Sequence, residues 1–266
     1  MPKKHTDKEM TLHIHKKHEA LAKEILEIPN GKHPVLHTFC DNRNRVELIE
    51  IEGTKLVIKR YKKPNICNRV IYTFFRKSKA RRAYEHALRI LRCGVSTPFP
   101  VAYMEQKRFG LYHTGYFVSE YMNLPTLKEW DPATHDKAEN ERMKKDFINF
   151  TIELHQKGIL PLDYNTKNIF YRKDEASGCY KFALTDINRA KFGHISHYKD
   201  AMRSFEQLGI PAENLVQIIS EYTTRQGSDL EASLFVALLY RIRKRYRRMA
   251  KSVIKKAIKI GGNKDY

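Results

Sequence analysis

Cysteine is scarce in this chain of 266 residues, and its four copies lie far apart in the sequence. They are Cys40, Cys67, Cys93 and Cys179, and no two of them form a Cys-x-x-Cys pair. This spacing disfavours both a structural zinc site and a disulfide framework. Scattered thiols are typical of a reducing compartment, so we expect the protein in the cytoplasm.

Long apolar runs are also missing from the sequence. No run approaches the ~20 residues that a helix needs to span a bilayer. The chain begins with a polar segment that carries His5, His13, His15 and His18. These histidines could bind a metal, but we favour a solvated N-terminal segment. The protein is therefore expected to be cytoplasmic or held at the cytoplasmic face of a membrane.

Acidic residues are few relative to basic ones. The chain has 50 Lys and Arg against 30 Asp and Glu, a formal net charge of +20. Such a charge indicates an anionic partner: nucleic acid, an anionic membrane or an anionic substrate. A nucleic-acid-binding protein is disfavoured, because the sequence has no RNA-reading aromatic motif, zinc finger or recognisable helix-turn-helix.

Much of the basic charge lies in two clusters, at 76–82 and 240–251. The second cluster falls in a long predicted helix, roughly Asp229 to Ile260. Apolar residues recur along this helix at three- and four-residue steps and form one stripe. The stripe consists of Phe235, Leu238, Leu239, Ile242, Tyr246, Met249, Val253, Ala257 and Ile260. Three interpretations stay open. The helix lies on an anionic membrane, or the stripe packs on the protein and the charges are solvated, or the helix packs up to about Leu239 and contacts the membrane from Arg241 onward.

The most informative motif is an Asp and an Asn five positions apart, Asp163 and Asn168. Asp186 follows at the end of a second hydrophobic run. This order is typical of kinase-like phosphoryl transfer. One carboxylate accepts the proton of the attacking hydroxyl, while an amide oxygen and a second carboxylate hold Mg²⁺ on the nucleotide phosphates. We therefore predict Asp163 as the base and Asn168 and Asp186 as the metal ligands.

Upstream segments fit the same machinery. The β-rich runs 46–51 and 55–61 predict a hairpin, and the second contains Lys59 in a Val-Ile-Lys triplet. In kinases such a lysine contacts the α- and β-phosphates of the nucleotide. A helix is predicted over 78–93, closed by a glycine. It carries Glu85, which is either solvated or the ion-pair partner of Lys59.

A second hairpin, 100–106 with 116–121, leads to the place where a kinase crosses from its small to its large lobe. Glu120 and Met122 are placed there by order alone, as residues whose backbone would bind adenine. The predicted fold class is α+β, a two-lobed protein-kinase-like fold. An antiparallel-sheet N-lobe with one main helix would span 1–122, and a compact, mostly helical C-lobe would span 123–266.

Four separated motifs resemble the Kdo/WaaP lipopolysaccharide kinase family, and more narrowly its members from Bacteroides-type bacteria. The resemblance runs from about Asn44 to about Phe192 and is specific because the motifs keep their order. The motifs are Ser78-Lys79-Ala80-Arg81-Arg82-Ala83-Tyr84-Glu85, Gly94-Val95-Ser96-Thr97-Pro98-Phe99-Pro100, Asp163-Tyr164-Asn165-Thr166-Lys167-Asn168-Ile169 and Thr185-Asp186-Ile187-Asn188-Arg189.

The resemblance implies a kinase that uses ATP and Mg²⁺ to phosphorylate an inner-core sugar. The acceptor would be the 4-hydroxyl of a Kdo (3-deoxy-D-manno-octulosonic acid) residue on lipid A, or a core heptose. It also implies a Lys59–Glu85 pair on the nucleotide, Asp163 as base, and Asn168 and Asp186 as metal ligands. An anionic glycolipid substrate at the cytoplasmic face of the inner membrane fits the basic clusters.

Two departures from the kinase pattern limit these expectations. No glycine-rich loop precedes Lys59, so phosphate cover would come from side chains and turn amides of residues 40–45. Pro161-Leu162-Asp163 lacks the usual Arg before the catalytic Asp, which disfavours regulation by phosphorylation. The sequence does not identify the acceptor of the phosphate. The alternative is therefore another compact kinase-fold phosphotransferase, either an atypical protein kinase or a small-molecule kinase.

Overall fold

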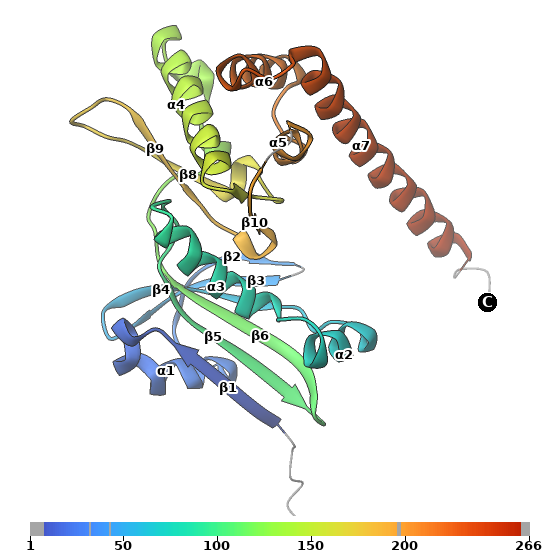
Figure 1. Cartoon of the computed structure of the whole chain (residues 1–266). Coiled ribbons are helices and arrows are strands. Elements are labelled where there is room, and N and C mark those ends of the chain that lie inside the picture. Colours follow the sequence, from blue (N-terminus) through green and yellow to red (C-terminus); the bar gives the residue numbers. More distant parts are fainter. Residues whose placement is uncertain (1–7, 32, 43, 196–197, 262–266) are drawn as a thin grey trace, which may run out of the picture. The chain divides into compact units, whose positions relative to one another are not determined.

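The computed structural model describes residues 8–31, 33–42, 44–195 and 198–261 (Figure 1). The chain divides into two compact units. The first unit ends at Leu124 and also contains Ala183–Arg189, and the second contains Pro125–Phe182 and the chain from Ala190 onward. Asp186 therefore belongs to the same unit as Lys59, although 126 residues separate them in sequence (186 − 59 − 1).

The first unit is built on a six-stranded antiparallel sheet in the order β1-β5-β6-β4-β3-β2. Its strands are β1 (Lys8–Ile14), β2 (Val35–Asp41), β3 (Asn44–Ile51), β4 (Thr54–Tyr61), β5 (Pro100–Arg108) and β6 (Leu111–Glu120). Both predicted hairpins are present. The β3–β4 turn passes through Glu52 and Gly53, which both have positive φ (48° and 73°), as a two-residue hairpin turn requires.

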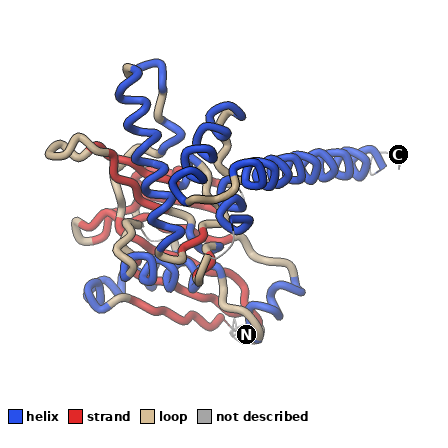
Figure 2. Tube along the Cα trace, turned by 45° about the horizontal axis from the view of Figure 1, so that its top comes forward, coloured by secondary structure: helices blue, strands red, loops and turns tan. Residues whose placement is uncertain are grey.

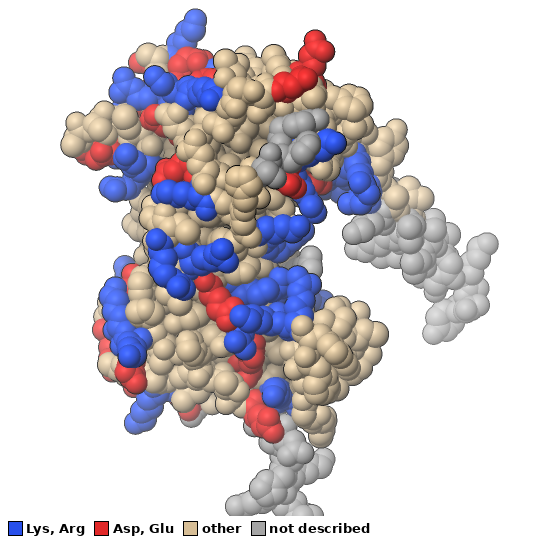
Figure 3. Space-filling view, in the orientation of Figure 1, with Lys and Arg blue, Asp and Glu red and all other residues tan. Residues whose placement is uncertain are grey.

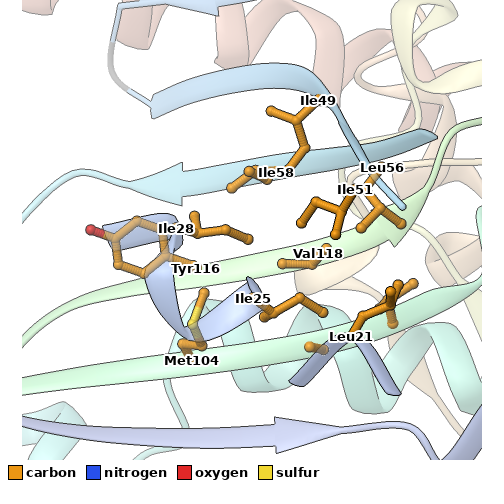
Figure 4. Packing of buried hydrophobic residues seen from close by; sticks show 12 residues of the cluster. Leu21, Ile25, Ile28, Ile49, Ile51, Leu56, Ile58, Met104, Tyr116 and Val118 are labelled. Carbon is orange, nitrogen blue, oxygen red and sulfur yellow. The ribbon is translucent and has the colours of Figure 1, made fainter. Parts of the chain in front are cut away.

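The prediction of a solvated N-terminal segment is wrong for the described residues 8–30. Strand β1 pairs along its length with β5, and helix α1 (Ala22–Glu27) follows through the 3-10 turn η1 (Lys16–Leu21). The apolar side chains of Leu21, Ile25 and Ile28 are buried against the sheet (Figure 4). Their spacing of three and four residues is the helical pattern that the surrounding histidines obscured. His5 lies outside the described residues.

Figure 4 shows the core that this helix completes. Alternate residues of the central strands point into it, because successive side chains of a strand face opposite sides of the sheet. On β4 these are Leu56 and Ile58, both almost fully buried. The intervening residues Val57 and Lys59 are partly exposed, so they share the other face, as the sequence predicted. Lys59 is thereby fixed on a rigid central strand.

Helix α3 (Lys79–Arg92) matches the predicted helix 78–93 closely. The side chain of Ser78 caps its first turn by accepting a hydrogen bond from the Arg81 amide at 3.1 Å, and Gly94 ends it with φ 70°. Its buried residues include Ala80, Ala83 and Ala87, whose small side chains allow close packing. A Cβ on Gly115 of β6 would lie 3.0 Å from the Cβ of Ala80. The nine-residue helix α2 (Ile66–Phe74) precedes α3.

The second unit is mostly helical, as predicted for the C-lobe. Its helices are α4 (Lys137–Gln156), α5 (Tyr198–Phe205), α6 (Ala212–Gln226) and α7 (Leu230–Gly261). Two short strand pairs accompany them: β7 (Ile159–Leu160) with β10 (Lys191–Phe192), and β8 (Ile169–Lys173) with β9 (Tyr180–Leu184). Figure 2 shows α7 extending well beyond α4 and α6 as one long helix.

Helix α7 does not pack through its apolar stripe. Its fully or nearly fully buried residues are the small Ser233 and Ala237. The stripe residues with described side chains from Phe235 to Val253 are exposed, Tyr246 at 67% and Val253 at 65%. Within this chain, the interpretation that the stripe packs on the rest of the protein is therefore wrong. Ala257 and Ile260 lie where side chains are not described.

Candidate active site

In the first unit, Lys59 and Asp186 form an ion pair, with 2.6 Å between Lys59 Nζ and Asp186 Oδ1. Lys59 projects from β4, and Asp186 follows the end of β9. Tyr61, two residues further along β4, lies beside the pair, with its ring centroid 5.6 Å from Lys59 Nζ. Burial, and then the charge of Asp186, raise the pKa of Tyr61 well above its usual value, so the phenol stays neutral.

The backbone at Asp186 has φ 53°, a left-handed conformation that a non-glycine residue adopts at a cost. Local bonds hold it there. The side-chain amide of Asn188 donates to Asp186 Oδ1 at 2.6 Å. The carbonyl of Leu184, two residues before Asp186, accepts a hydrogen bond from the Thr97 hydroxyl at 2.6 Å. Backbone strain that the surroundings maintain is typical of functional positions, and here it fixes a carboxylate beside a lysine.

Glu85 is not the partner of Lys59 in this structure, which corrects that prediction. Its carboxylate accepts from Lys77 Nζ at 2.8 Å and from Arg81 Nε at 2.9 Å. Partial burial alone would raise the pKa of Glu85, but these two bonds lower it overall. The neighbouring His86 faces the Asp186 segment instead, because its Nδ1 bonds the carbonyl of Ile187 at 2.9 Å. The sequence alone does not indicate this contact between His86 and the segment that carries Asp186.

At the end of β6, Glu120 is held by several bonds. Its amide donates to the Phe99 carbonyl at 2.9 Å, and its carboxylate pairs with Lys17 at 2.8 Å and with His18 at 2.9 Å. The Met122 carbonyl accepts from the Leu124 amide at 3.0 Å. The backbone groups that could meet adenine are thus the Glu120 carbonyl and the Met122 amide, and this role stays a prediction.

In the second unit, Asp163 and Asn168 lie in one hydrogen-bonded loop. The Asp163 carbonyl accepts from the Asn165 amide at 2.9 Å and from Asn168 Nδ2 at 3.0 Å. The predicted base and the predicted metal ligand are therefore linked directly. Because the amide nitrogen of Asn168 makes this bond, its Oδ1 atom, which is the type of atom that magnesium binds, is left for a cation.

Buried residues around the loop hold Asp163 in place. Tyr164, next in the chain, is 1% exposed. Its ring stacks on Phe147 with centroids 5.7 Å apart, and its hydroxyl bonds Thr151 Oγ1 at 2.8 Å. Burial raises the pKa of Tyr164 far above its usual value. Upstream, Gly158 has φ 68° and packs so tightly that a Cβ would lie 2.5 Å from the Gly193 carbonyl oxygen.

Lys244 of α7 belongs to the basic cluster 240–251, for which contact with lipid headgroups is one interpretation. Its side chain is instead partly buried, and Nζ donates to the Glu206 carbonyl at 3.1 Å. Burial lowers the pKa of Lys244, and the neighbouring charges that act on it include Arg248, Glu206 and Asp163. The charge of Asp163 thus reaches this cation of the C-terminal helix.

The residues present fit a nucleotide-bound magnesium ion by their chemistry. Asn168 offers an amide oxygen and Asp186 a carboxylate, and hard oxygen atoms are the ligands that magnesium takes in such sites. In the β2–β3 turn expected to cover the phosphates, Asn42 is described, whereas Arg43 lies outside the described residues. The roles of Asn168 and Asp186 as metal ligands remain predictions.

Comparison with known proteins identifies the family. The profile of the lipopolysaccharide kinase (Kdo/WaaP) family matches residues 36–227. This chain belongs to that family. The match covers the whole segment from β2 to α6, which includes every predicted site residue. The protein is thus an ATP-dependent kinase of lipopolysaccharide core synthesis. No curated protein matches the sequence closely enough to add a relative.

Solved structures share the fold at low sequence identity. WaaP in complex with acyl carrier protein aligns with a TM-score of 0.59 and 14% identity, over 89% of this chain and 98% of that one. A putative aminoglycoside phosphotransferase from Ralstonia eutropha JMP134 aligns with a TM-score of 0.50 and 14% identity, over 83% of this chain and 86% of that one. Aminoglycoside-3'-phosphotransferase of type VIII aligns with a TM-score of 0.50 and 12% identity, over 82% of this chain and 98% of that one. The predicted protein-kinase-like fold is confirmed.

Proposed function

We propose that this kinase transfers the γ-phosphate of ATP to the 4-hydroxyl of a Kdo residue attached to lipid A. The observation that carries the choice of acceptor is the partly buried Lys244 within electrostatic reach of Asp163. A cation near the base favours an acceptor that carries a negative charge beside the reacting hydroxyl. Kdo carries a carboxylate, whereas a core heptose without phosphate is neutral.

In this proposal Asp163 accepts the proton of the sugar hydroxyl as that oxygen attacks the γ-phosphate. Lys59 neutralises phosphate oxygens of the nucleotide, and its present partner Asp186 would then turn toward the cation. Magnesium, held by Asn168 and Asp186 on the nucleotide, would supply positive charge to the phosphates. The kinase fold needs these groups mainly for positioning and for electrostatic stabilisation.

The adenine end of the site rests on backbone groups. The adenine edge offers one donor and one acceptor, which the Glu120 carbonyl and the Met122 amide would complement. The backbone hydrogen bonds support this choice, because the Glu120 amide and the Met122 carbonyl already have partners within the protein. Side-chain changes at these two positions should accordingly matter less than changes in backbone conformation.

Peripheral membrane contact belongs to the same proposal. Among the described residues, every helix is too short or too polar to span a bilayer. Helix α7 instead exposes an apolar stripe flanked by Arg243, Arg247 and Arg248, all of them exposed. A helix with an apolar stripe and basic flanks suits the surface of an anionic leaflet, where a glycolipid acceptor would reside. The predicted lipid-facing cations of this helix also include Lys251, whose side chain is not described.

The experiment is a phosphorylation assay with ATP and magnesium, read by mass spectrometry. Kdo-containing lipid A should gain the mass of one phosphate, and lipid A without Kdo should not. A Lys244→Gln variant should lose activity toward a soluble Kdo acceptor mainly through a higher KM, while Arg243→Gln serves as the matched exposed control. Equal phosphorylation of a neutral heptose acceptor by the wild-type protein would favour the heptose kinase instead.

A further inference from the structure

Helix α2 presents apolar side chains to solvent although it is firmly attached to the first unit. None of its nine residues is buried. Ile66 is 57% exposed and Phe74 68% exposed, and Phe75, directly after the helix, is 81% exposed. Ile71, at 39%, lies on the same helix. Exposed large apolar residues that gather in one place usually mark an interaction site.

Polar bonds and a ring contact hold α2 to the sheet: the rings of Tyr72 and Tyr112 meet edge to face, with centroids 5.5 Å apart. Arg69 Nε donates to the Tyr112 carbonyl at 2.9 Å, and the Arg69 guanidinium also donates to the Arg108 carbonyl at 3.3 Å. The Tyr112 amide donates to the Thr73 hydroxyl at 2.9 Å. The side chain of Asn65 caps the helix by accepting from the Asn68 amide at 3.0 Å. The helix is therefore fixed with Arg69, Tyr72 and Thr73 toward the sheet, while Ile66, Ile71 and Phe74 stay exposed.

The charge around α2 has one sign. The segment from Arg60 to Tyr84 contains no Asp or Glu. Its basic residues are Arg60, Lys62, Lys63, Arg69, Arg76, Lys77, Lys79, Arg81 and Arg82. Three of these that border the helix, Lys62, Lys63 and Arg76, are exposed. Figure 3 shows the uncharged surface over α2 with Lys and Arg atoms beside it.

We propose that α2 and Phe75 dock on an anionic lipid surface. The four apolar side chains would enter the headgroup boundary, while Lys62, Lys63 and Arg76 contact the headgroups. Apolar and aromatic residues flanked by cations are the composition of interfacial helices, and each cation near an anionic leaflet adds attraction. A stable protein complex needs about 800 Å² on each partner, which four side chains on one short helix do not provide.

This inference adds a second contact to the membrane role proposed for α7, and it rests on that role only for its biological setting. It does not depend on the identity of the sugar acceptor. The two contacts belong to different units of the chain, so each can be removed separately. A membrane contact in the sheet-bearing unit would bind the nucleotide half of the kinase to the bilayer as well as the helical half.

The test is co-sedimentation of the full chain with vesicles of phosphatidylglycerol and phosphatidylcholine, and with phosphatidylcholine alone. F74S/F75S should weaken binding to the anionic vesicles by about tenfold or more, since burial of aromatic side chains drives interfacial binding. K62Q/K63Q/R76Q should weaken it too and should reduce its dependence on salt. The matched control is Leu26→Ser with Leu36→Ser, two exposed apolar residues of the same unit.

Activity on a soluble acceptor and the thermal unfolding midpoint report whether each variant is folded. If folded F74S/F75S binds anionic vesicles as tightly as the wild type while R243Q/R247Q/R248Q does not, the inference for α2 is overturned and the contact through α7 stands. Two other results also overturn it. The first is wild-type binding to neutral vesicles that is as tight as binding to anionic vesicles. The second is that the partner bound through Phe74 and Phe75 is a soluble acidic protein and not the vesicles. Kinase activity on the soluble acceptor tests the proposed reaction independently of all these outcomes.

Discussion

The predicted site residues of the two units are held in different ways. In the first unit, side chains lock the site, since Asp186 bonds Lys59 and Asn188 while its backbone keeps a positive φ. In the second unit, the backbone locks the site, since the carbonyl oxygen of Asp163 receives the bonds from Asn165 and Asn168. The first arrangement suits a carboxylate that exchanges one cationic partner for another. The second fixes the main chain of the loop that carries the Asp163 carboxylate.

This contrast predicts that substitutions in the two halves have separable effects. Changes at Asp186 should affect nucleotide binding and turnover together. Changes at Asp163 should affect turnover alone, because the bonds that hold its loop use the main chain and survive substitution of the side chain. If substitutions at Asp163 and at Asp186 changed nucleotide binding and turnover to the same extent, this prediction would be wrong.

The largest effect on turnover is expected from Asp163→Asn. Asparagine has the same shape and leaves the bonds to the Asp163 carbonyl intact, but it cannot accept a proton. Loss of a general base costs about 10²–10⁴-fold in rate. Steady-state turnover and nucleotide affinity, measured on the same preparation, should show a loss only in the former. Near-normal turnover would remove Asp163 from its assigned role.

Asp186→Asn should reduce nucleotide affinity as well as turnover. The substitution removes a charge that the cation needs, so the magnesium-dependent part of ATP binding should fall by about tenfold or more, or about 1.4 kcal/mol. Calorimetric titration with and without magnesium separates this part from the rest. Unchanged affinity in magnesium would mean that the carboxylate serves Lys59 and not the metal.

Gly158→Ala tests the backbone-held half without touching a reacting group. Alanine at φ 68° is strained, and its Cβ would lie 2.5 Å from the Gly193 carbonyl oxygen. We expect the free energy of unfolding to fall by about 1–3 kcal/mol, measured by denaturant titration. Gly53→Ala in the β3–β4 turn is the matched control, because it has a similar φ but open space around the new Cβ. Equal destabilisation of both variants would show that conformation, not the contact with Gly193, sets the cost.

The parts of this protein that the sequence predicted are those with a local cause. Alternating side chains and a turn at Glu52 and Gly53 indicate the β3–β4 hairpin, and Ser78 and Gly94 mark the ends of α3. The roles of Asp163, Asn168 and Asp186 stay predictions, drawn from the order in which kinases carry a base and two oxygen ligands. Each of these signals is contained in a few adjacent residues.

The parts that the sequence did not predict depend on tertiary packing. Helix α1 was not predicted because Leu21, Ile25 and Ile28 follow a segment rich in His and Lys, and the sheet on which they pack is not evident from the local sequence. The outward face of α2 has no local signal, because its attachment uses the side chain of Arg69 on distant carbonyl groups. The direction of Lys244 likewise depends on the carbonyl of Glu206, 38 residues away in sequence.

The smallest effect is expected from Glu85→Gln, and it separates the structure from the family resemblance. In the structure Glu85 bonds Lys77 and Arg81, two surface cations of its own segment. Exposed pairs of this kind contribute about 0–1 kcal/mol, so kcat and nucleotide affinity should change by less than about fivefold. Lys59→Met, measured beside it, should lose far more, because Lys59 faces Asp186. If Glu85→Gln instead matched Lys59→Met in its loss of nucleotide affinity, the two residues would pair in the nucleotide-bound enzyme. The bonds of Glu85 to Lys77 and Arg81 would then belong to the nucleotide-free state alone, and α3 would have to turn by roughly one residue to exchange His86 for Glu85.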